Sequence, residues 1–151
     1  MYIILWKYFI IMDLENKKCV IIIDSTLKLG IIANVASILS ITLGNKVPQL
    51  VGPDVLDRDQ IVHLGLTKLP IPVLGASAVE IASIRNSFLE VKNEEDMLVD
   101  FTSFAQQAKT YDAYRAHIET ADTSEIMYLG IAIFADRKAT NKSTKGLALI
   151  R

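Results

Sequence analysis

Hydrophobic residues after Lys18 fall into short continuous runs, and the first run predicts a central strand. Residues 19–24 are almost all apolar and β-branched, which is typical of a strand buried on both faces. Residues 31–43 are apolar nearly all round, which predicts a helix packed between the sheet and another layer. Gly44 is placed to end that helix in a left-handed cap. Strand, loop and helix form the first half of a βαβ unit.

The next segment, residues 45–68, shows no helical period and predicts a β-hairpin that leaves the main sheet. Apolar stretches at 51–56 and 61–64 flank a polar turn at 57–60. Residues 69–74 then read as a strand that contains Pro70 and Pro72. Two prolines at this spacing remove N–H groups on one side, so we expect this strand at an edge of the sheet or beside an opening.

Helical and strand patterns alternate through the rest of the chain. Ser77 and Glu80 match a capping box that opens a helix to about residue 91, and Ser103 and Gln106 match a second one. Helical character after the second box extends through Tyr111 to about residue 119. The expected strands are 97–102, 126–134 and 147–150, with a basic stretch at 137–145 before the last.

This order of elements predicts an α/β fold, a three-layer sandwich. We expect a mixed, mostly parallel sheet of about four strands with helices on both faces, plus the hairpin excursion. Residues 13–151 form a single domain. Residues 1–12 are an apolar leader of uncertain role: an upstream start before Met12, an extra edge strand and a partner-binding segment are all open. The leader is too short for a membrane span, and acidic residues follow it where a signal peptide would be cleaved.

Composition narrows the function classes. The 151 residues include 17 acidic and 16 basic side chains, which give a net charge of −1 and disfavour a DNA-coating protein. The single cysteine, Cys19, excludes a disulfide framework and a cysteine-rich zinc site, and fits a cytoplasmic protein. We expect no cofactor, no metal and no membrane partner. No catalytic motif is evident.

The main candidate site is the loop that joins the first strand to the first helix. Ligands of α/β proteins bind beyond the carboxyl ends of strands, where a helix N-terminus offers free N–H groups. Asp24, Ser25 and Lys28 lie in this loop, and Asn34 lies about one turn inside the helix. Asp100 ends another expected strand, and we predict that it converges with Asp24, Lys28 and Asn34 in one cleft. The alternative is a structural network at the surface.

A second candidate is His63, which lies near Asp54, Asp57 and Asp59 in sequence. Carboxylate and imidazole groups could bind a metal or form an acid–base pair, but aspartates also stabilise turns, and His63 could instead line a ligand pocket. The basic stretch at 137–145 could contact phosphate groups or could be a solvated loop.

Residues distributed over the whole chain from about residue 17 carry a family resemblance. They are 18–24, Leu27, Gly30, Ala33, Asn34, Ala36, 51–54, Asp57, 63–65, 70–72, Tyr111, Tyr114, Gly130, Asn141, Lys142, Thr144 and 147–151. The chain resembles the family known as domain of unknown function 2000, which has the peptidyl-tRNA hydrolase type II fold.

The resemblance implies a peptidyl-tRNA hydrolase II-like domain. Type II hydrolases continue after the first strand with a Gly-Lys pair that is absent here, and Asn34 and Ser37 stand where they have Gln and His. We therefore expect a small ligand of unknown identity at the carboxyl end of the first strand. The alternatives are a divergent hydrolase of peptidyl or aminoacyl esters and an RNA-binding module without catalysis. A homodimer is one expected assembly.

Overall fold

The structure is a computed structural model that describes residues 13–151. The prediction of an apolar leader at residues 1–12 lies outside the described residues. Strand β1 (Lys17–Asp24) is in the middle of the main sheet, where it pairs with β4 (Val73–Ala76) on one side and β6 (Tyr128–Asp136) on the other. All its residues except Lys18 are buried, so the predicted central strand is confirmed.

The main sheet has five strands in the order β5-β6-β1-β4-β7. The two outer strands are β5 (Met97–Thr102) and β7 (Ala148–Leu149). Only β1 and β4 pair in parallel, and the other three pairings are antiparallel. The sheet is therefore mixed as predicted, but the expectation of a mostly parallel sheet of about four strands is wrong.

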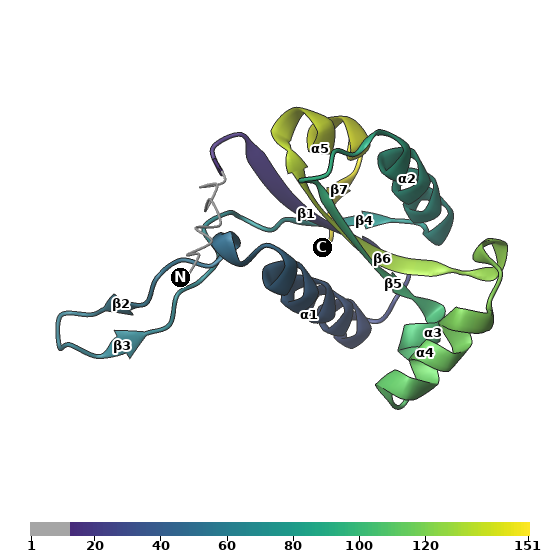
Figure 1. Cartoon of the computed structure of the whole chain (residues 1–151), viewed down its shortest axis with the longest axis horizontal. Helices are drawn as coiled ribbons and strands as arrows, with labels where there is room; N and C mark the ends of the chain where they lie inside the picture. Colours follow the sequence, from purple (N-terminus) through teal and green to yellow (C-terminus); the bar gives the residue numbers. More distant parts are fainter. Residues whose placement is uncertain (1–12) are drawn as a thin grey trace, which may run out of the picture.

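The reason for the antiparallel arrangement is the connection between β5 and β6. This connection contains α3 (Ser103–Gln107), α4 (Tyr111–Thr120) and the short 3-10 turn η2 (Thr123–Glu125). A crossover helix would return the chain to the start of the sheet and make the next strand parallel. In Figure 1, α3 and α4 stay beyond the end of β5, so β6 starts at that end and runs back.

Helices cover both faces of the sheet, which confirms the three-layer sandwich (Figure 1). Helix α1 (Leu29–Lys46) packs on one face over Ile21, Ile23 and Phe134. On the other face, α2 (Ala78–Val91) and α5 (Arg137–Ser143) pack over a second cluster that contains Val20, Ile22 and Ile131. The alternation of β1 side chains between the two clusters follows from the two-residue repeat of a strand.

Helix α1 continues to Lys46, past the expected end at Gly44. Gly44 keeps a helical conformation because the chain turns only at Val47, where η1 (Pro48–Leu50) begins. Helix α1 is long and apolar enough to cross a membrane, but the core helices of soluble proteins can be equally long and apolar. Here Ile32, Val35, Leu39 and Leu43 are buried in the core.

The capping predictions are partly confirmed. At α2, the Ser77 hydroxyl accepts the N–H of Glu80 and the Glu80 carboxylate accepts the N–H of Ser77, as predicted. At α3 the cap is Thr102, one residue before the predicted Ser103. The helix predicted to continue to residue 119 is broken after Gln107 and restarts at Tyr111, because Thr110 caps a new helix there.

Two further expectations need correction. Pro70 and Pro72 precede β4 and are not part of it, and β4 is an inner strand because β7 covers its outer side. The carbonyl of Pro72 still accepts the N–H of Ile21. The basic stretch expected as a loop forms α5 for most of its length, and Arg137 starts this helix directly at the end of β6.

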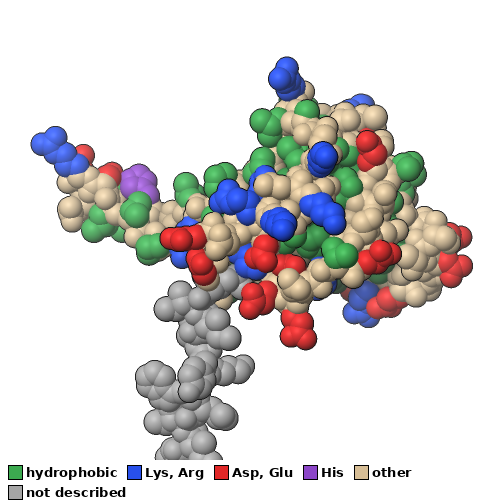
Figure 2. Space-filling view, turned by 90° about the horizontal axis from the view of Figure 1, so that it is seen from above, with side chains coloured by type: hydrophobic (Ala, Val, Ile, Leu, Met, Phe, Trp, Pro, Cys, Tyr) green, Lys and Arg blue, Asp and Glu red, His purple; other side chains and the backbone are tan. Residues whose placement is uncertain are grey.

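A β-hairpin projects from the body, as predicted. Strands β2 (Val55–Leu56) and β3 (Val62–His63) pair around a turn whose backbone N–H groups at Asp59 and Ile61 donate to the Asp57 carboxylate. We call residues 51–67 the arm. Figure 1 shows the arm extending away from the sheet, and Figure 2 shows apolar side chains along its surface. The arm therefore lies outside both core clusters.

Candidate functional site

The short polar side chains of the loop after β1 are used to shape the loop. Oδ1 of Asp24 accepts the backbone N–H of Thr26 at 2.9 Å and its hydroxyl at 2.7 Å. The hydroxyl of Ser25 donates to the carbonyl of Ala76 at 3.4 Å. These bonds tie the end of β1 to the end of β4 and fix the direction in which the chain enters α1.

The N-terminus of α1 is open. Lys28 occupies the capping position, where its side chain forms no capping hydrogen bond, and the first turn contains no acidic residue. Asn34 is exposed on α1, away from the buried side chains of this helix. Both residues therefore face solvent, and the first turn keeps unsatisfied N–H groups with a partial positive charge.

Asp100 lies elsewhere on the same half of the sheet. Strands β1 and β5 run in the same direction, so Asp24 and Asp100 both lie toward one end of the sheet, but β6 separates them. Asp100 pairs with Nε of Arg85 on α2 at 2.7 Å, whereas Asp24 is bonded to Thr26. Of the four residues predicted to converge, only Asp100 lines the cavity described below.

His63 is on the arm, remote from the loop after β1 (Figures 1 and 2). Its Nε2 lies 3.1 Å from Oδ2 of Asp57, and both side chains are largely exposed. The hydrogen bond from His63 lowers the pKa of Asp57, and the N–H groups of Ile61 and Asp59 act in the same direction. Within residues 13–151, no three potential metal-ligating side chains lie together.

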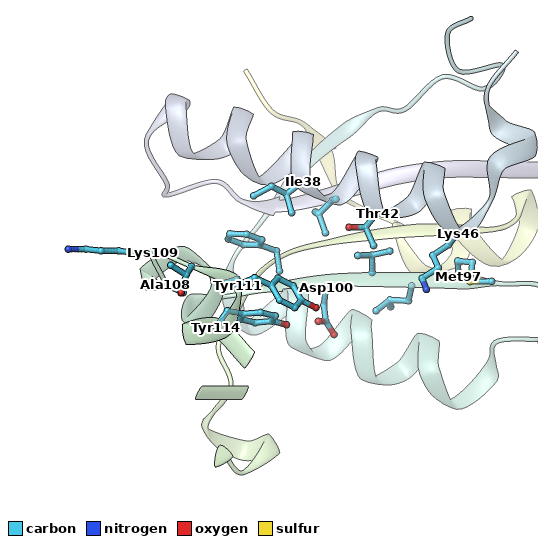
Figure 3. A pocket seen from close by; sticks show the side chains of 15 residues that line it. Ile38, Thr42, Lys46, Met97, Asp100, Ala108, Lys109, Tyr111 and Tyr114 are labelled. Atoms are coloured by element: carbon cyan, nitrogen blue, oxygen red, sulfur yellow. The ribbon is translucent and has the colours of Figure 1, made fainter. Parts of the chain in front are cut away.

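The structure contains a groove of about 650 Å³ beside the edge strand β5. Helix α1 forms one wall, β5 forms the floor, and α3 and α4 close one end (Figure 3). The apolar lining consists mainly of Ile38, Leu39, Met97, Val99, Phe101 and Ala105. A volume of this size is within the range of pockets that hold small organic molecules.

One end of the groove is polar and aromatic. The rings of Tyr111 and Tyr114 lie 5.7 Å apart in an edge-on arrangement, and Figure 3 shows both hydroxyl groups directed toward Asp100. Burial raises the pKa of Tyr114, and the charges of Asp100 and Tyr111 raise it further, so this hydroxyl stays protonated and can donate a hydrogen bond. The guanidinium of Arg85 lies 4.3 Å above the ring of Tyr128 and holds Asp100 from behind.

The opposite end of the groove carries a positive charge. Lys46, in the last turn of α1, directs its amine toward β5 beside Met97, whereas Lys109 points away from the groove (Figure 3). Lys46 forms no ion pair within the part of the chain that the structure describes. The groove therefore joins a free cation to a carboxylate with two tyrosine hydroxyls across an apolar floor.

Comparisons with known proteins support the family and the fold. The family model "Protein of unknown function (DUF2000)" matches residues 17–151. The chain belongs to the DUF2000 family. This DUF2000 chain is similar to the solved structure of Atu0240, a protein of unknown function from Agrobacterium tumefaciens strain C58. The two share 22% identity with a TM-score of 0.79, over 89% of this chain and 97% of the other. No curated protein matches the DUF2000 chain.

The comparisons show the family and the fold, and the resemblance to type II peptidyl-tRNA hydrolases stays a prediction. Sequence reasoning on this DUF2000 domain identified Asp100 as a site candidate. It favoured a packing role for Tyr111 and Tyr114, and it missed Lys46 and the apolar floor. The spacing of Tyr111 and Tyr114 was a usable signal, since residues three apart share one helix face. Nothing in the sequence around Lys46 indicates a binding role, because that role depends on where α1 crosses β5.

Proposed function

We propose that this chain is a binding domain for a small amphipathic organic molecule, which occupies the groove beside β5. The observation that carries the proposal is the composition of the groove: an apolar lining that includes Leu39, Val99 and Phe101 lies between the Lys46 ammonium group at one end and a polar, aromatic end with Asp100. Ligand pockets generally combine an apolar lining with a few polar groups that fix orientation.

The two ends define the chemistry of the ligand. Lys46 forms no ion pair with any residue from 13 to 151, so its ammonium group favours a carboxylate, sulfonate or similar anion. The protonated hydroxyl of Tyr114 and the carboxylate of Asp100 favour a hydroxyl or amide group that can both accept and donate. The ligand is then an anion with an elongated apolar body and a neutral polar group at its far end.

The groove supports this proposal better than the loop after β1 does. In that loop Asp24 and Ser25 are engaged in local hydrogen bonds, whereas the groove has space and a lysine at one end. A ligand at the loop, with Lys28 and Asn34, remains a separate prediction. The same holds for a divergent hydrolase, an RNA-binding module and a cytoplasmic location.

A dye titration tests the proposal. The probe is 8-anilinonaphthalene-1-sulfonate, an apolar anion whose fluorescence rises on binding. Thr42→Phe places a ring in the groove from the α1 wall, so we expect it to weaken saturable binding at least tenfold. Val79→Phe adds the same ring at a site on α2 that is 80% exposed, and it serves as the matched control.

A second pair of measurements separates charge from apolar contact. Lys46→Gln should weaken binding of the anionic dye several-fold but leave binding of the neutral dye Nile red nearly unchanged, because Coulomb attraction acts only on the anion. Lys138→Gln, on α5, is the control for a lost surface charge. Equal dye binding by the wild type and Thr42→Phe would contradict the proposal, since any dye on the arm or elsewhere is unaffected by this substitution.

A further inference from the structure

The arm exposes large apolar side chains along its whole length. They are Val51, Val55, Leu56, Ile61, Val62, Leu64 and Leu66, with exposed fractions from 49% to 82%. Val55 pairs with His63 and Leu56 pairs with Val62, so neighbouring residues of each strand point to opposite faces of the hairpin. Both faces of the arm therefore carry apolar groups into solvent.

A hairpin of this kind requires a surface to pack against. An isolated two-stranded hairpin is at best marginally stable in water, and apolar patches of several hundred Å² mark interaction surfaces. The seven exposed side chains carry on the order of 400 Å² of apolar surface, from about 100 Å² for a complete side chain. The arm therefore has the properties of an interaction surface.

Helix α1 offers a matching surface. No charged residue occurs between Lys28 and Lys46, and its solvent-facing side carries Ile41, 73% exposed, among small or uncharged residues. Leu29, at the start of the helix, is 77% exposed. The sequence predicted that a helix so apolar lies between two layers; within residues 13–151 its buried side packs toward the sheet and its opposite side is exposed.

The arm and α1 have equal lengths and lie end to end. Figure 1 shows the arm leaving the C-terminal end of α1 at an angle, with η1 at the bend between them. The 18 residues of α1 span about 27 Å, and eight extended residues from the base of the arm to its tip span about 26 Å. Because the two are similar in length and meet at η1, a two-fold axis that passes near η1 and bisects the angle between them would lay each arm along α1 of a second copy.

We infer that two copies of this chain form a two-fold symmetric dimer in which the arm of each copy packs on the solvent-facing side of α1 in the other. The charges at the two ends agree with this arrangement. The tip of the arm, where Asp57 and Asp59 flank Arg58, has a net negative charge and reaches the N-terminus of the other α1, where Lys28 and the uncapped N–H groups are positive. This assignment does not depend on the proposed ligand.

A specific interface usually takes about 800 Å² of accessible surface from each partner. Each copy offers two surfaces to this contact, one arm and one helix face. The contact is isologous, because the arm of each copy meets the same helix in the other. Each arm meets the helix of the same partner, so both contacts are used within one pair and the assembly closes at two copies.

The oligomeric state of the full chain tests the inference. We expect sedimentation velocity across a range of micromolar concentrations to show a dimer for the wild type. Leu64→Ser with Leu66→Ser, both outside the core, should raise the protein concentration at the midpoint of dimerisation at least tenfold. Val79→Ser with Val91→Ser removes two equally exposed apolar side chains from α2 and should change nothing.

A charge exchange identifies the two surfaces that meet. In a dimer of Asp59→Lys, the new lysine of each arm faces Lys28 of the other copy. In a dimer of Lys28→Glu, the new glutamate faces Asp59. Each variant alone should therefore dimerise more weakly than the wild type. An equimolar mixture of the two variants should recover dimers, because both contacts of the mixed dimer then join opposite charges. The arm projects away from Lys28 of its own chain, so recovery requires two copies.

Circular dichroism of every variant checks that the monomer remains folded, as expected for exposed positions. A wild type that stays monomeric at every concentration would overturn the inference and leave the arm for a different protein. A dimer that is insensitive to Leu64→Ser with Leu66→Ser would also overturn it. Recovery in the mixture, but in neither variant alone, would support the contact between the arm tip and the start of α1.

Discussion

The close packing of α1 on the sheet depends on the missing side chain of Gly130. This residue lies in β6 between Ile23 and Phe101 of the two neighbouring strands. A Cβ atom at Gly130 would lie 2.8 Å from Cγ1 of Val35 and 3.3 Å from the carbonyl oxygen of Ile22. The first distance is shorter than real contacts, so Gly130→Ala must push α1 away from the sheet or distort Val35.

The size of the effect follows from known costs of core substitutions. Overpacking costs about 1–3 kcal/mol, and replacing a glycine in a strand returns about 0.5–1 kcal/mol, so we expect Gly130→Ala to lower the free energy of unfolding by about 1–2 kcal/mol. Val35→Ala removes two buried methyl groups and leaves a cavity, which costs about 2–3 kcal/mol. Val35 is completely buried, so the full cost applies.

The double variant decides whether the two sites share one space. If the methyl group that Gly130→Ala introduces fills the volume vacated by Val35→Ala, the pair of substitutions costs about 2 kcal/mol, well below the sum of the single effects. Urea unfolding with unchanged slopes measures all three values. Gly44→Ala is the control, because no atom lies within 4 Å of the added Cβ in α1, and it should stabilise by about 0.5–1 kcal/mol. Additivity within about 0.5 kcal/mol would refute the reasoning.

Four further outcomes are expected. Ser77→Ala removes the cap of α2 and should lower the melting midpoint by about 2–4 °C. Burial lowers the pKa of Lys17, but the hydrogen bond and charge of Asp136 outweigh burial and hold the pKa above 10.5. The stability that Lys17 adds over Lys17→Met is therefore present below pH 10.5 and is lost as the pH rises through the folded-state pKa. Purified chain should show little or no cleavage of peptidyl-tRNA, because the Gly-Lys pair and the histidine of type II hydrolases are missing; turnover comparable with theirs would contradict this. A chain that starts at Met12 should keep its melting midpoint, since every described contact is retained, and a drop of several degrees would show otherwise.

Element positions were predictable from the sequence where one physical cause dominates. The β-branched run at Ile21, Ile22 and Ile23 indicates a strand with two neighbours, and Ser77 with Glu80 indicates a helix start, because each depends on adjacent residues. The direction of β6 was not predictable. The sequences of α3 and α4 are compatible with a crossover connection, but these helices do not carry the chain back along the sheet. The basic stretch after Asp136 was misread since charge favours solvent without excluding a short helix.

The candidate site shows the same division. That Asp24 and Asp100 lie toward one end of the sheet could be predicted, because β1 and β5 run in the same direction. Their separation by β6 could not be predicted, because the strand order depends on contacts between segments far apart in sequence. The groove beside β5 depends on the lateral position of α1 over Val99 and Phe101, which no local pattern encodes.

The pairing of β1 with β6 has a consequence for synthesis of the chain in the cell. About 100 residues separate the end of β1 from the start of β6, so at ribosomal rates of about 5–20 residues per second the nascent chain waits about 5–20 s for that partner. During this interval β1, whose residues are nearly all buried in the folded protein, has an open edge, which is a template for pairing with other chains. We therefore expect the soluble yield of this protein to depend more on translation speed and chaperone supply than on the stability of the folded chain.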